Sequence, residues 1–195
     1  MTVVSNDESQ RKVGRPPLLF LDIDDVLCVS HQHGGRQAAQ ALNTRLEAGA
    51  IPFPWEQLFE EEARLALDLL MQRTGPRIIV TSTWLVLFNR AAMAEVFRLS
   101  GLARIADALH PQWDAPQNRF ETRLAAIERW LSANHLGEAF AVLDDCESGT
   151  AIAGSSMERE GRVILCEVGR GLHRGQLPAL EAALALPAKG RIPRS

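Results

Sequence analysis

The sequence is poor in cysteine and contains no Cys-x-x-Cys pair. Its three cysteines, Cys28, Cys146 and Cys166, are an odd and widely spaced set. Such a set does not fit the disulfide framework of small secreted domains, and it lacks the ligand spacing of a structural zinc site. The cysteine pattern therefore indicates a protein of the reducing cytoplasm.

Long apolar runs and a strong excess of one charge are also missing. No segment reaches the roughly 18 consecutive apolar residues that a membrane-spanning helix needs. The first 17 residues lack the apolar stretch of a signal peptide. With 21 basic and 24 acidic residues, the formal net charge is −3, which gives no electrostatic footprint for a duplex or an anionic membrane. We expect a cytoplasmic protein without a membrane partner.

What is present is enough apolar surface for one packed domain. The chain has 195 residues, of which 46% are hydrophobic and 23% charged. These values are typical of a single globular domain. We expect one folded domain over residues 17–186, a disordered tail at 1–16 and a flexible tail at 187–195.

Short apolar runs alternate with amphipathic segments along the chain. Four runs predict buried strands, at residues 18–23, 77–81, 139–143 and 162–165. Helical periodicity predicts helices near residues 55–71, 88–99, 120–134 and 176–186. This alternation predicts an α/β fold, a Rossmann-like three-layer α/β/α sandwich with a central parallel sheet.

Residues 30–54 form an insertion between the first strand and its helix. The segment is rich in glycine and proline and is too short to be a separate domain, so we expect a small flap. His31 and His33 have a spacing that could hold a transition metal. Because no third ligand is near them in the sequence, they are better explained as solvated flap residues.

Acidic residues stand at the ends of two predicted strands. Asp22, Asp24 and Asp25 end the first, and Asp144 and Asp145 follow the third. Parallel strands present their carboxyl ends at one edge, so we expect these five carboxylates in one crevice. Like charges repel there unless a cation relieves them, and Mg²⁺ prefers such oxygen ligands. One such pair could merely cap a helix, but two favour a metal site.

Four short motifs, in order, resemble the haloacid dehalogenase (HAD) superfamily of aspartate-dependent phosphotransferases. Residues 21–27, Leu-Asp-Ile-Asp-Asp-Val-Leu, are similar to its first motif, Asp-x-Asp-x-(Thr/Val). An apolar strand ending in Thr81-Ser82 resembles the second motif. Arg123 best meets the third, with Arg119 as the alternative, and Leu143-Asp144-Asp145 resembles the fourth. The order of the four makes the resemblance specific.

Further details resemble the small-cap bacterial branch that also occurs as the HAD domain of RNA-repair proteins. They are Thr81-Ser82-Thr83-Trp84, Trp130-Leu131 and Gly171-Leu172. A small cap implies an open crevice and a phosphorylated substrate such as a small molecule, a nucleotide, a nucleic-acid end or a phosphoprotein. The net charge speaks against a long polyanion. Three tryptophans could stack on a base, although packing is the commoner use: Trp84, Trp113 and Trp130.

The resemblance implies a Mg²⁺-dependent phosphatase with two catalytic aspartates. Asp22 would be the nucleophile that forms an aspartyl-phosphate, and Asp24 the general acid and base. Ser82 and Arg123 would bind the phosphoryl oxygens, with Thr81 in place of Ser82 if the second strand ends one residue earlier than predicted. Arginine suits this position because its planar guanidinium can bind phosphate at two points.

The resemblance also implies the metal ligands. The Asp22 carboxylate, the Asp24 backbone carbonyl and Asp144 would hold Mg²⁺, and Asp145 would bind through water or orient that shell. The family usually has glycine where this chain has Asp25. Aspartate tolerates the backbone of that position better than most residues do, so we favour catalysis. The alternatives are a weak or inactive binding or regulatory module, or a phosphotransferase.

Overall fold

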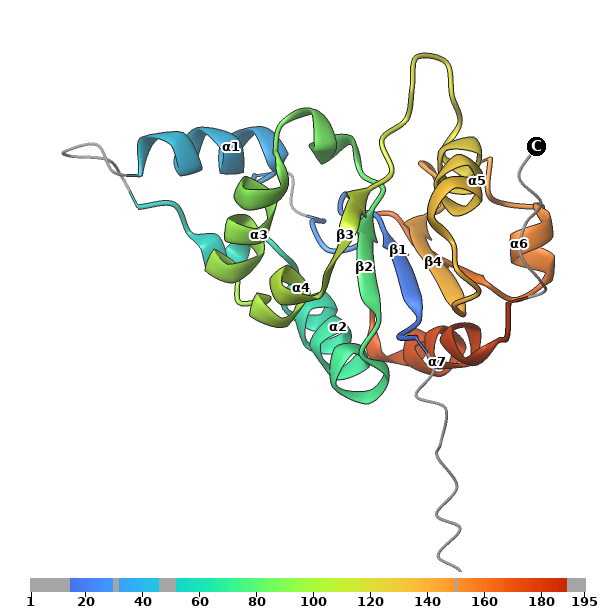
Figure 1. The fold of residues 1–195 in the computed structure, drawn as a ribbon. Helices are drawn as coiled ribbons and strands as arrows, with labels where there is room; N and C mark the ends of the chain where they lie inside the picture. Colours follow the sequence, from blue (N-terminus) through green and yellow to red (C-terminus); the bar gives the residue numbers. More distant parts are fainter. Residues whose placement is uncertain (1–14, 30–31, 46–51, 150, 189–195) are drawn as a thin grey trace, which may run out of the picture.

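The protein is built around a sheet of five parallel strands (Figure 1). A computed structural model describes residues 15–29, 32–45, 52–149 and 151–188. Most of the two predicted tails lies outside the described residues, as do Ser30, His31 and residues 46–51 of the predicted flap. Within the described part, no helix combines the length and the hydropathy required to cross a bilayer.

The strand order is β3-β2-β1-β4-β5, with every neighbouring pair parallel. The strands are β1 (Leu18–Leu21), β2 (Arg77–Val80), β3 (Leu109–Asp114), β4 (Phe140–Asp145) and β5 (Val163–Cys166). The prediction of a parallel sheet is confirmed. Strand β3 was not predicted, because it lies at the sheet edge, where Pro111 and polar side chains are tolerated and the apolar pattern is lost.

All four predicted helices are present, although their boundaries differ from the prediction, and the structure has three further helices among the described residues. The helices are α1 (Gly35–Thr44), α2 (Glu61–Thr74), α3 (Arg90–Leu99), α4 (Ala103–Ala108), α5 (Arg123–Asn134), α6 (Ser156–Arg159) and α7 (Leu177–Ala185), with 3-10 turns at Trp55–Gln57, Thr83–Val86 and Arg174–Gln176. The helix predicted over 55–71 is therefore a 3-10 turn followed by α2. Helices α1, α4 and α6 were not predicted, and α1 lies within the expected flap.

Alternate residues of β1 pack into separate cores on the two faces of the sheet. Leu19 and Leu21 join a cluster with α2, α3, α4 and α7, whereas Leu18 and Phe20 join one with α5 and α6. All four side chains are buried. Figure 1 shows α5 and α6 on one side of the strands and α2, α3 and α4 on the other. The three-layer sandwich is thus confirmed, and it explains why β1 is apolar at every position.

The sheet order places its topological reversal between β1 and β4. The chain builds β2 and β3 on one side of β1 and then returns to add β4 on the other. Ligands of such sheets bind beyond the carboxyl ends of the strands at this reversal. Asp22 directly follows β1, and Asp144 and Asp145 are the last two residues of β4. Strand β4 is therefore longer than the predicted 139–143, and it carries both acids into the site.

Candidate functional site

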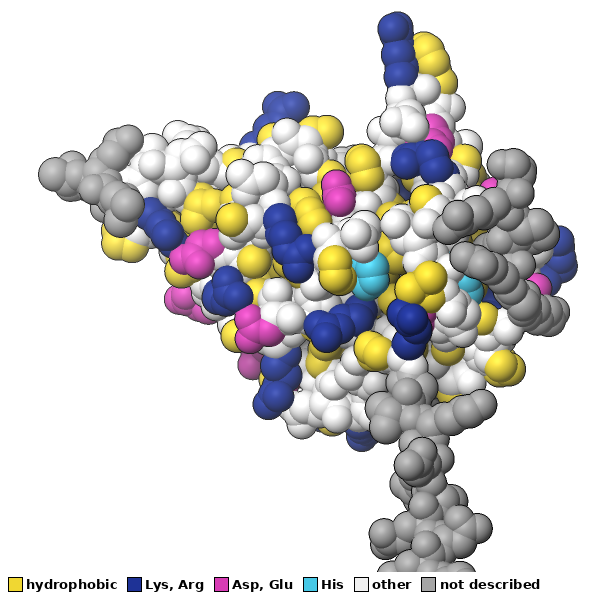
Figure 2. Space-filling model, viewed as in Figure 1, with side chains coloured by type: hydrophobic (Ala, Val, Ile, Leu, Met, Phe, Trp, Pro, Cys, Tyr) yellow, Lys and Arg dark blue, Asp and Glu magenta, His cyan; other side chains and the backbone are white. Residues whose placement is uncertain are grey.

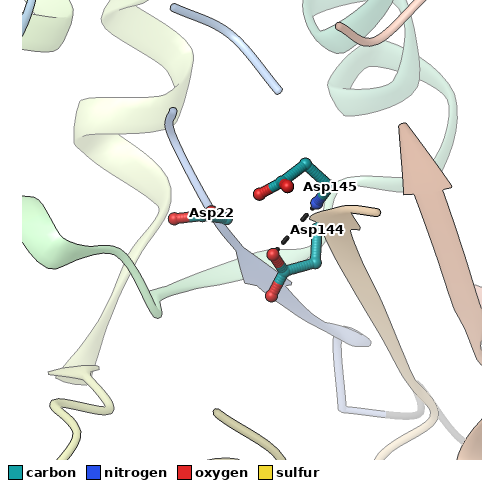
Figure 3. Close-up of side chains that lie close together, drawn as sticks. All are labelled: Asp22, Asp144 and Asp145. Atoms are coloured by element: carbon teal, nitrogen blue, oxygen red, sulfur yellow. Dashed lines mark hydrogen bonds between the residues drawn. The ribbon is translucent and has the colours of Figure 1, made fainter. Parts of the chain in front are cut away.

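Three buried carboxylates converge where β1 and β4 end. One ligand oxygen from each of Asp22, Asp144 and Asp145 lies within 4.8 Å of the others. Figure 3 shows the three side chains beside the ends of the two neighbouring strands. The pairing aligns Leu21 with Leu143, and the Asp22 N–H donates to the Leu143 carbonyl at 3.0 Å. Strand register therefore brings together acids that are far apart in the sequence.

The carboxylates of Asp24 and Asp25 do not join this cluster, so the expectation of five converging acids is wrong. Asp24 accepts hydrogen bonds from Trp84 Nε1 at 2.9 Å and from Thr83 Oγ1 at 3.1 Å. Asp25 accepts one from the Gly169 N–H at 2.8 Å. Donors that follow β2 and β5 thus draw these two side chains to opposite sides of the crevice. The metal ligand expected from Asp24 is its backbone carbonyl, which these side-chain hydrogen bonds do not involve.

Asp25 adopts the backbone conformation for which the family usually uses glycine. Its φ is 53°, in the left-handed region. Aspartate enters this region more readily than most residues with a side chain. Because its carboxylate bonds to Gly169, it lies away from the three-carboxylate cluster. The Asp25 carboxylate therefore adds no ligand to that cluster.

Arg123 is the basic residue of the site. As the first residue of α5, it follows Thr122, which caps the helix by accepting from the Ala125 N–H. Its buried Nη1 lies 3.1 Å from Asp22 Oδ1 and 3.2 Å from Asp144 Oδ2. Its Nε donates to Gln117 Oε1 at 3.2 Å. Arg123 thus has the position expected of the third motif. Its single positive charge lies beside a cluster of three carboxylates.

Both hydroxyls of the second motif reach the cluster. Strand β2 ends at Val80, one residue earlier than predicted. Under that condition the resemblance implies Thr81, in place of Ser82, as the phosphate-binding residue. Thr81 Oγ1 accepts from Arg123 Nη1 at 3.4 Å. Ser82 hydrogen-bonds to the Asp22 carboxylate and accepts from the Trp84 N–H at 3.4 Å. The structure brings together all the predicted catalytic and phosphate-binding residues except the carboxylate of Asp24, which stands to one side.

Burial and mutual repulsion make the cluster hard to ionise. Burial raises the pKa of Asp22 above its usual value, although the Arg123 guanidinium opposes this. Burial, with the nearby Asp22 charge, raises the pKa of Asp144 to about 8. One guanidinium therefore does not neutralise these acids. A divalent cation would stabilise their charged forms.

The oxygen atoms of the cluster fit a hard cation. Asp145 Oδ2 is buried and accepts no hydrogen bond, and buried Asp22 Oδ1 faces Arg123 Nη1 at 3.1 Å. The other Asp145 oxygen accepts from the Glu147 and Ser148 N–H groups, which fixes the side chain. Buried polar atoms without partners are uncommon. Carboxylate oxygens left unsatisfied at one point are suited to Mg²⁺.

His33, one of the two histidines singled out in the flap, is not part of the three-carboxylate cluster. His33 packs edge-on against the Phe53 ring, with centroids 5.4 Å apart. Among the residues that the structure describes, the group able to hold a metal contains no histidine. His31 lies outside the described residues. The interpretation of His33 as a flap residue fits this packing.

A Rossmann-like sheet whose reversal point carries buried aspartates, an arginine and two hydroxyls defines a HAD-type fold and site. Residues 18–177 match the family described as the HAD domain in Swiss Army Knife RNA repair proteins, and the chain belongs to this family. No curated protein and no solved structure gives a significant match. The family supports a hydrolase of HAD type in general, and its members typically use a divalent metal.

Two contacts of the site were missed from the sequence. Trp84 was considered only for packing or base stacking, yet its indole N–H holds Asp24. Gln117 was not considered, yet it orients Arg123. The contact between Trp84 and Asp24 joins loops that follow β2 and β1, so it leaves no pattern in the linear sequence. Gln117 and Arg123 are six residues apart on one connection, but no regular element spans them. The predicted parallel sheet alone would have placed the loops after the first two strands at the same edge.

Proposed function

We propose that this protein is a Mg²⁺-dependent phosphatase that hydrolyses phosphate esters through Asp22. The observation that carries the proposal is the buried cluster of Asp22, Asp144 and Asp145, in which Asp145 Oδ2 has no hydrogen-bond partner and Arg123 is the facing cation. Asp22, Asp144 and the Asp24 carbonyl would hold the ion, with Asp145 acting through water. When bound, Mg²⁺ offsets the negative charge of the phosphoryl group and the carboxylates.

The reaction needs two displacements at phosphorus. In the first, an Asp22 carboxylate oxygen forms a bond to phosphorus, the ester P–O bond breaks, and Asp24 protonates the leaving oxygen. In the second, Asp24 takes a proton from water, which attacks the aspartyl-phosphate and releases phosphate and Asp22. Trp84 and Thr83 hold the Asp24 carboxylate in a fixed position beside the nucleophile's loop.

Arg123 and the second-motif hydroxyls would bind the phosphoryl oxygens. The guanidinium offers several donors in one plane, and Gln117 fixes its orientation through Nε. Ser82 contacts Asp22, and Thr81 contacts Arg123, so each hydroxyl adjoins one of the two groups that meet the phosphate. This arrangement supports both hydroxyls as phosphate ligands.

The substrate class is proposed as a phosphate on a nucleotide or a nucleic-acid end. The flap is small, which leaves room for a substrate larger than the crevice. The family's description names RNA repair, which supports a nucleic-acid end. The net charge of −3 argues against a long polyanion footprint and for recognition close to the terminal phosphate.

Turnover of a panel of phosphate esters tests the proposal. The panel should include an aryl phosphate, nucleoside monophosphates and oligonucleotides with 5′- or 3′-terminal phosphates. We expect hydrolysis with excess Mg²⁺, its loss on chelation and its return when Mg²⁺ is restored. If the Mg²⁺-loaded protein hydrolyses no ester of the panel, the proposal is wrong.

Asp25→Gly tests the alternative of a binding module whose activity is blocked by Asp25. We expect no gain in hydrolysis, because glycine adopts the same positive φ and no carboxylate leaves the metal cluster. Loss of the hydrogen bond from Gly169 costs about 1 kcal/mol, which relief of the left-handed backbone offsets. A tenfold rise in kcat/KM would instead support the blocked-site alternative.

Trp84→Phe tests whether the hydrogen bond to Asp24 positions the general acid. Phenylalanine keeps the ring packing against Phe59 and Phe88 but removes the indole N–H. We expect kcat on alkyl phosphates to fall by about tenfold, part of the usual contribution of acid catalysis. An aryl phosphate with a good leaving group should be affected much less, because it needs little protonation.

Trp130→Phe is the matched control for this prediction. Trp130 is also buried, and its indole N–H donates to the Gln112 carbonyl at 3.0 Å on the other face of the sheet. The variant loses an equivalent hydrogen bond without touching Asp24. We expect unchanged kcat for both substrates. Equal losses in the two variants would show that the effect of Trp84→Phe is structural.

A further inference from the structure

The loop between β3 and α5, residues 115–122, projects from the edge of the sheet that carries the site. It is the narrow projection at the top of Figure 1, and Figure 2 shows basic and apolar side chains together at its tip. Phe120 is 91% exposed, the largest exposure recorded among the large hydrophobic side chains of the described residues. The Arg119 guanidinium carbon lies 4.8 Å from the centre of the Phe120 ring.

The loop holds Phe120 in an unfavourable position. Its φ is 66°, in the left-handed region, which a bulky side chain rarely adopts. The base of the loop is braced: Arg129 donates to the Pro116 carbonyl at 2.6 Å and to Glu121 at 3.0 Å, and Glu121 accepts from the Asn118 N–H at 2.7 Å. The surrounding hydrogen bonds maintain this backbone strain, while the Phe120 ring remains exposed to solvent. The arrangement therefore does not stabilise the fold. It indicates a contact made with another molecule.

The loop leads directly to the arginine that would bind phosphate. Gln117, within the loop, accepts from Arg123 Nε. Arg123 is three positions after Phe120, so their Cα atoms lie at most about 11 Å apart. Other exposed apolar side chains follow neighbouring strands at the same edge, with Val86 86% and Val168 44% exposed. Phe120, Val86 and Val168 are thus exposed apolar side chains at the edge of the sheet that carries the site. We expect the part of the substrate next to its phosphate to contact them, and Phe120 is the aromatic one.

We propose that Arg119 and Phe120 form a base-binding platform for the substrate. Phe120 stacks on the nucleobase of the nucleotide whose phosphate enters the site, and Arg119 contacts the phosphate of the adjoining nucleotide. This inference rests on the proposed function and extends it to the part of the substrate outside the crevice. Phenylalanine offers no hydrogen bond, so the platform accepts any base.

The position of the platform favours a nucleobase over a protein partner. A phosphoprotein substrate would also bring side chains close to the phosphate-binding arginine, but the family's description names RNA repair, which favours a nucleobase. An aromatic face beside a cation is the usual arrangement for single-stranded nucleic acid. Trp84 and Trp130, which the sequence offered for stacking, are buried with their indole N–H groups engaged, so they do not present a ring to the crevice.

Substrates that differ only in the base test the inference. The pairs are adenosine 5′-monophosphate against ribose 5-phosphate, and oligonucleotides whose phosphorylated terminal residue carries a base or is abasic. We expect the protein to prefer the base-bearing member by about 5- to 100-fold in kcat/KM, the range of one base–aromatic stack. Phe120→Ala should reduce the preference to about twofold or less and leave the rate on the abasic member unchanged.

Two further variants separate stacking from backbone strain. Phe120→Trp should retain the preference, because it keeps an aromatic face. Phe120→Gly should lose the preference while raising Tm, since glycine adopts φ of 66° without strain. Leu136→Ala is the control: Leu136 is also exposed, at 55%, but follows the far end of α5. It should leave the preference unchanged.

Arg119→Gln distinguishes a free nucleotide from a nucleic-acid end as the bound group. If Arg119 contacts the adjoining nucleotide, the variant should lower kcat/KM for the oligonucleotides much more than for adenosine 5′-monophosphate. An equal loss on both, or on neither, would overturn the role given to Arg119. The salt dependence of oligonucleotide turnover should weaken in the same variant.

Failure of this inference can be told from failure of the proposed function. If the protein hydrolyses the abasic esters but shows no preference for a base, or if Phe120→Ala keeps the preference, the platform is wrong and the phosphatase stands. If nothing is hydrolysed, the platform is tested by binding instead, with calorimetric Kd values of the Mg²⁺-loaded protein for the same pairs of compounds. Tighter binding of the base-bearing member that Phe120→Ala abolishes would support the platform, and equal Kd values would overturn it.

Discussion

Asp22→Asn is expected to lower phosphate-ester turnover at least about a thousandfold, because an amide cannot form the acyl phosphate that divides the reaction into two steps. The asparagine side chain would keep an oxygen for the Ile23 N–H and Ser82, the groups that hydrogen-bond Asp22. The fold should therefore persist. The measurement is kcat/KM on an aryl phosphate, together with the circular dichroism spectrum of the variant.

Asp25→Asn is the matched control for Asp22→Asn. It makes the same chemical change three residues away, at a carboxylate outside the metal cluster. Asparagine tolerates the φ of 53° and can still accept from the Gly169 N–H. We expect turnover close to that of the unmodified protein. Equal losses in the two variants, or full activity in Asp22→Asn, would rule out Asp22 as the nucleophile.

Asp144→Asn is expected to abolish the stabilisation of the protein by Mg²⁺. A hundredfold excess of ligand over Kd stabilises a folded protein by about 2.7 kcal/mol, which raises the Tm of a domain of this size by roughly 5 to 10 °C. Asp144 supplies one of the three converging ligands. The shift in Tm between Mg²⁺ and chelator should therefore be large in the unmodified protein and small in the variant.

The same substitution is expected to stabilise the metal-free protein. In the folded state, burial raises the pKa of Asp144 to about 8, from its usual 3.8. Between these values the folded state holds a proton that the unfolded chain releases. The free energy of unfolding of the metal-free protein therefore falls as pH rises through this window. Asparagine does not titrate, so the variant lacks this pH dependence. Near pH 8 we expect the free energy of unfolding of the metal-free variant to exceed that of the unmodified protein by about 1 to 2 kcal/mol.

Thermal melts in chelator at pH 5 and pH 8 measure this second effect. The unmodified protein should lose more stability between the two pH values than Asp144→Asn does. Asp107→Asn is the control, because Asp107 is an exposed acid paired with Arg98 at 2.8 Å, outside the site. Its pH dependence should match that of the unmodified protein. An Asp144→Asn variant less stable than the unmodified protein in chelator at pH 8 would contradict the expectation.

Four of the five strands were predictable, because each reads as an apolar run in the sequence, and three of them, β1, β2 and β4, are inner strands of the sheet. Leu18–Leu21 shows this most clearly, since every side chain meets one of the two cores. Strand β3 lies at the edge and has half-exposed polar residues, so it leaves no apolar run. Helix α1 was hidden by the glycines and prolines around it.

The location of the site was also predictable, whereas the orientation of its side chains was not. Strand register forces Asp22 and Asp144 together, and that follows from parallel pairing alone. The positions of Asp24 and Asp25 depend on donors from other loops, Trp84 and the Gly169 N–H. Phe120 carries no motif, and only its exposure and positive φ distinguish it. Contacts between loops are set by the packed fold and cannot be read from spacing.

The most direct test is a crystal structure of the protein soaked with Mg²⁺ and beryllium fluoride, which mimics a phosphoryl group on aspartate. Our account predicts one Mg²⁺ ion bound by Asp22 and Asp144, with the beryllium fluoride on the Asp22 carboxylate and in contact with Arg123. An ion bound elsewhere, or beryllium fluoride that leaves Asp22 unmodified while occupying another residue, would contradict it.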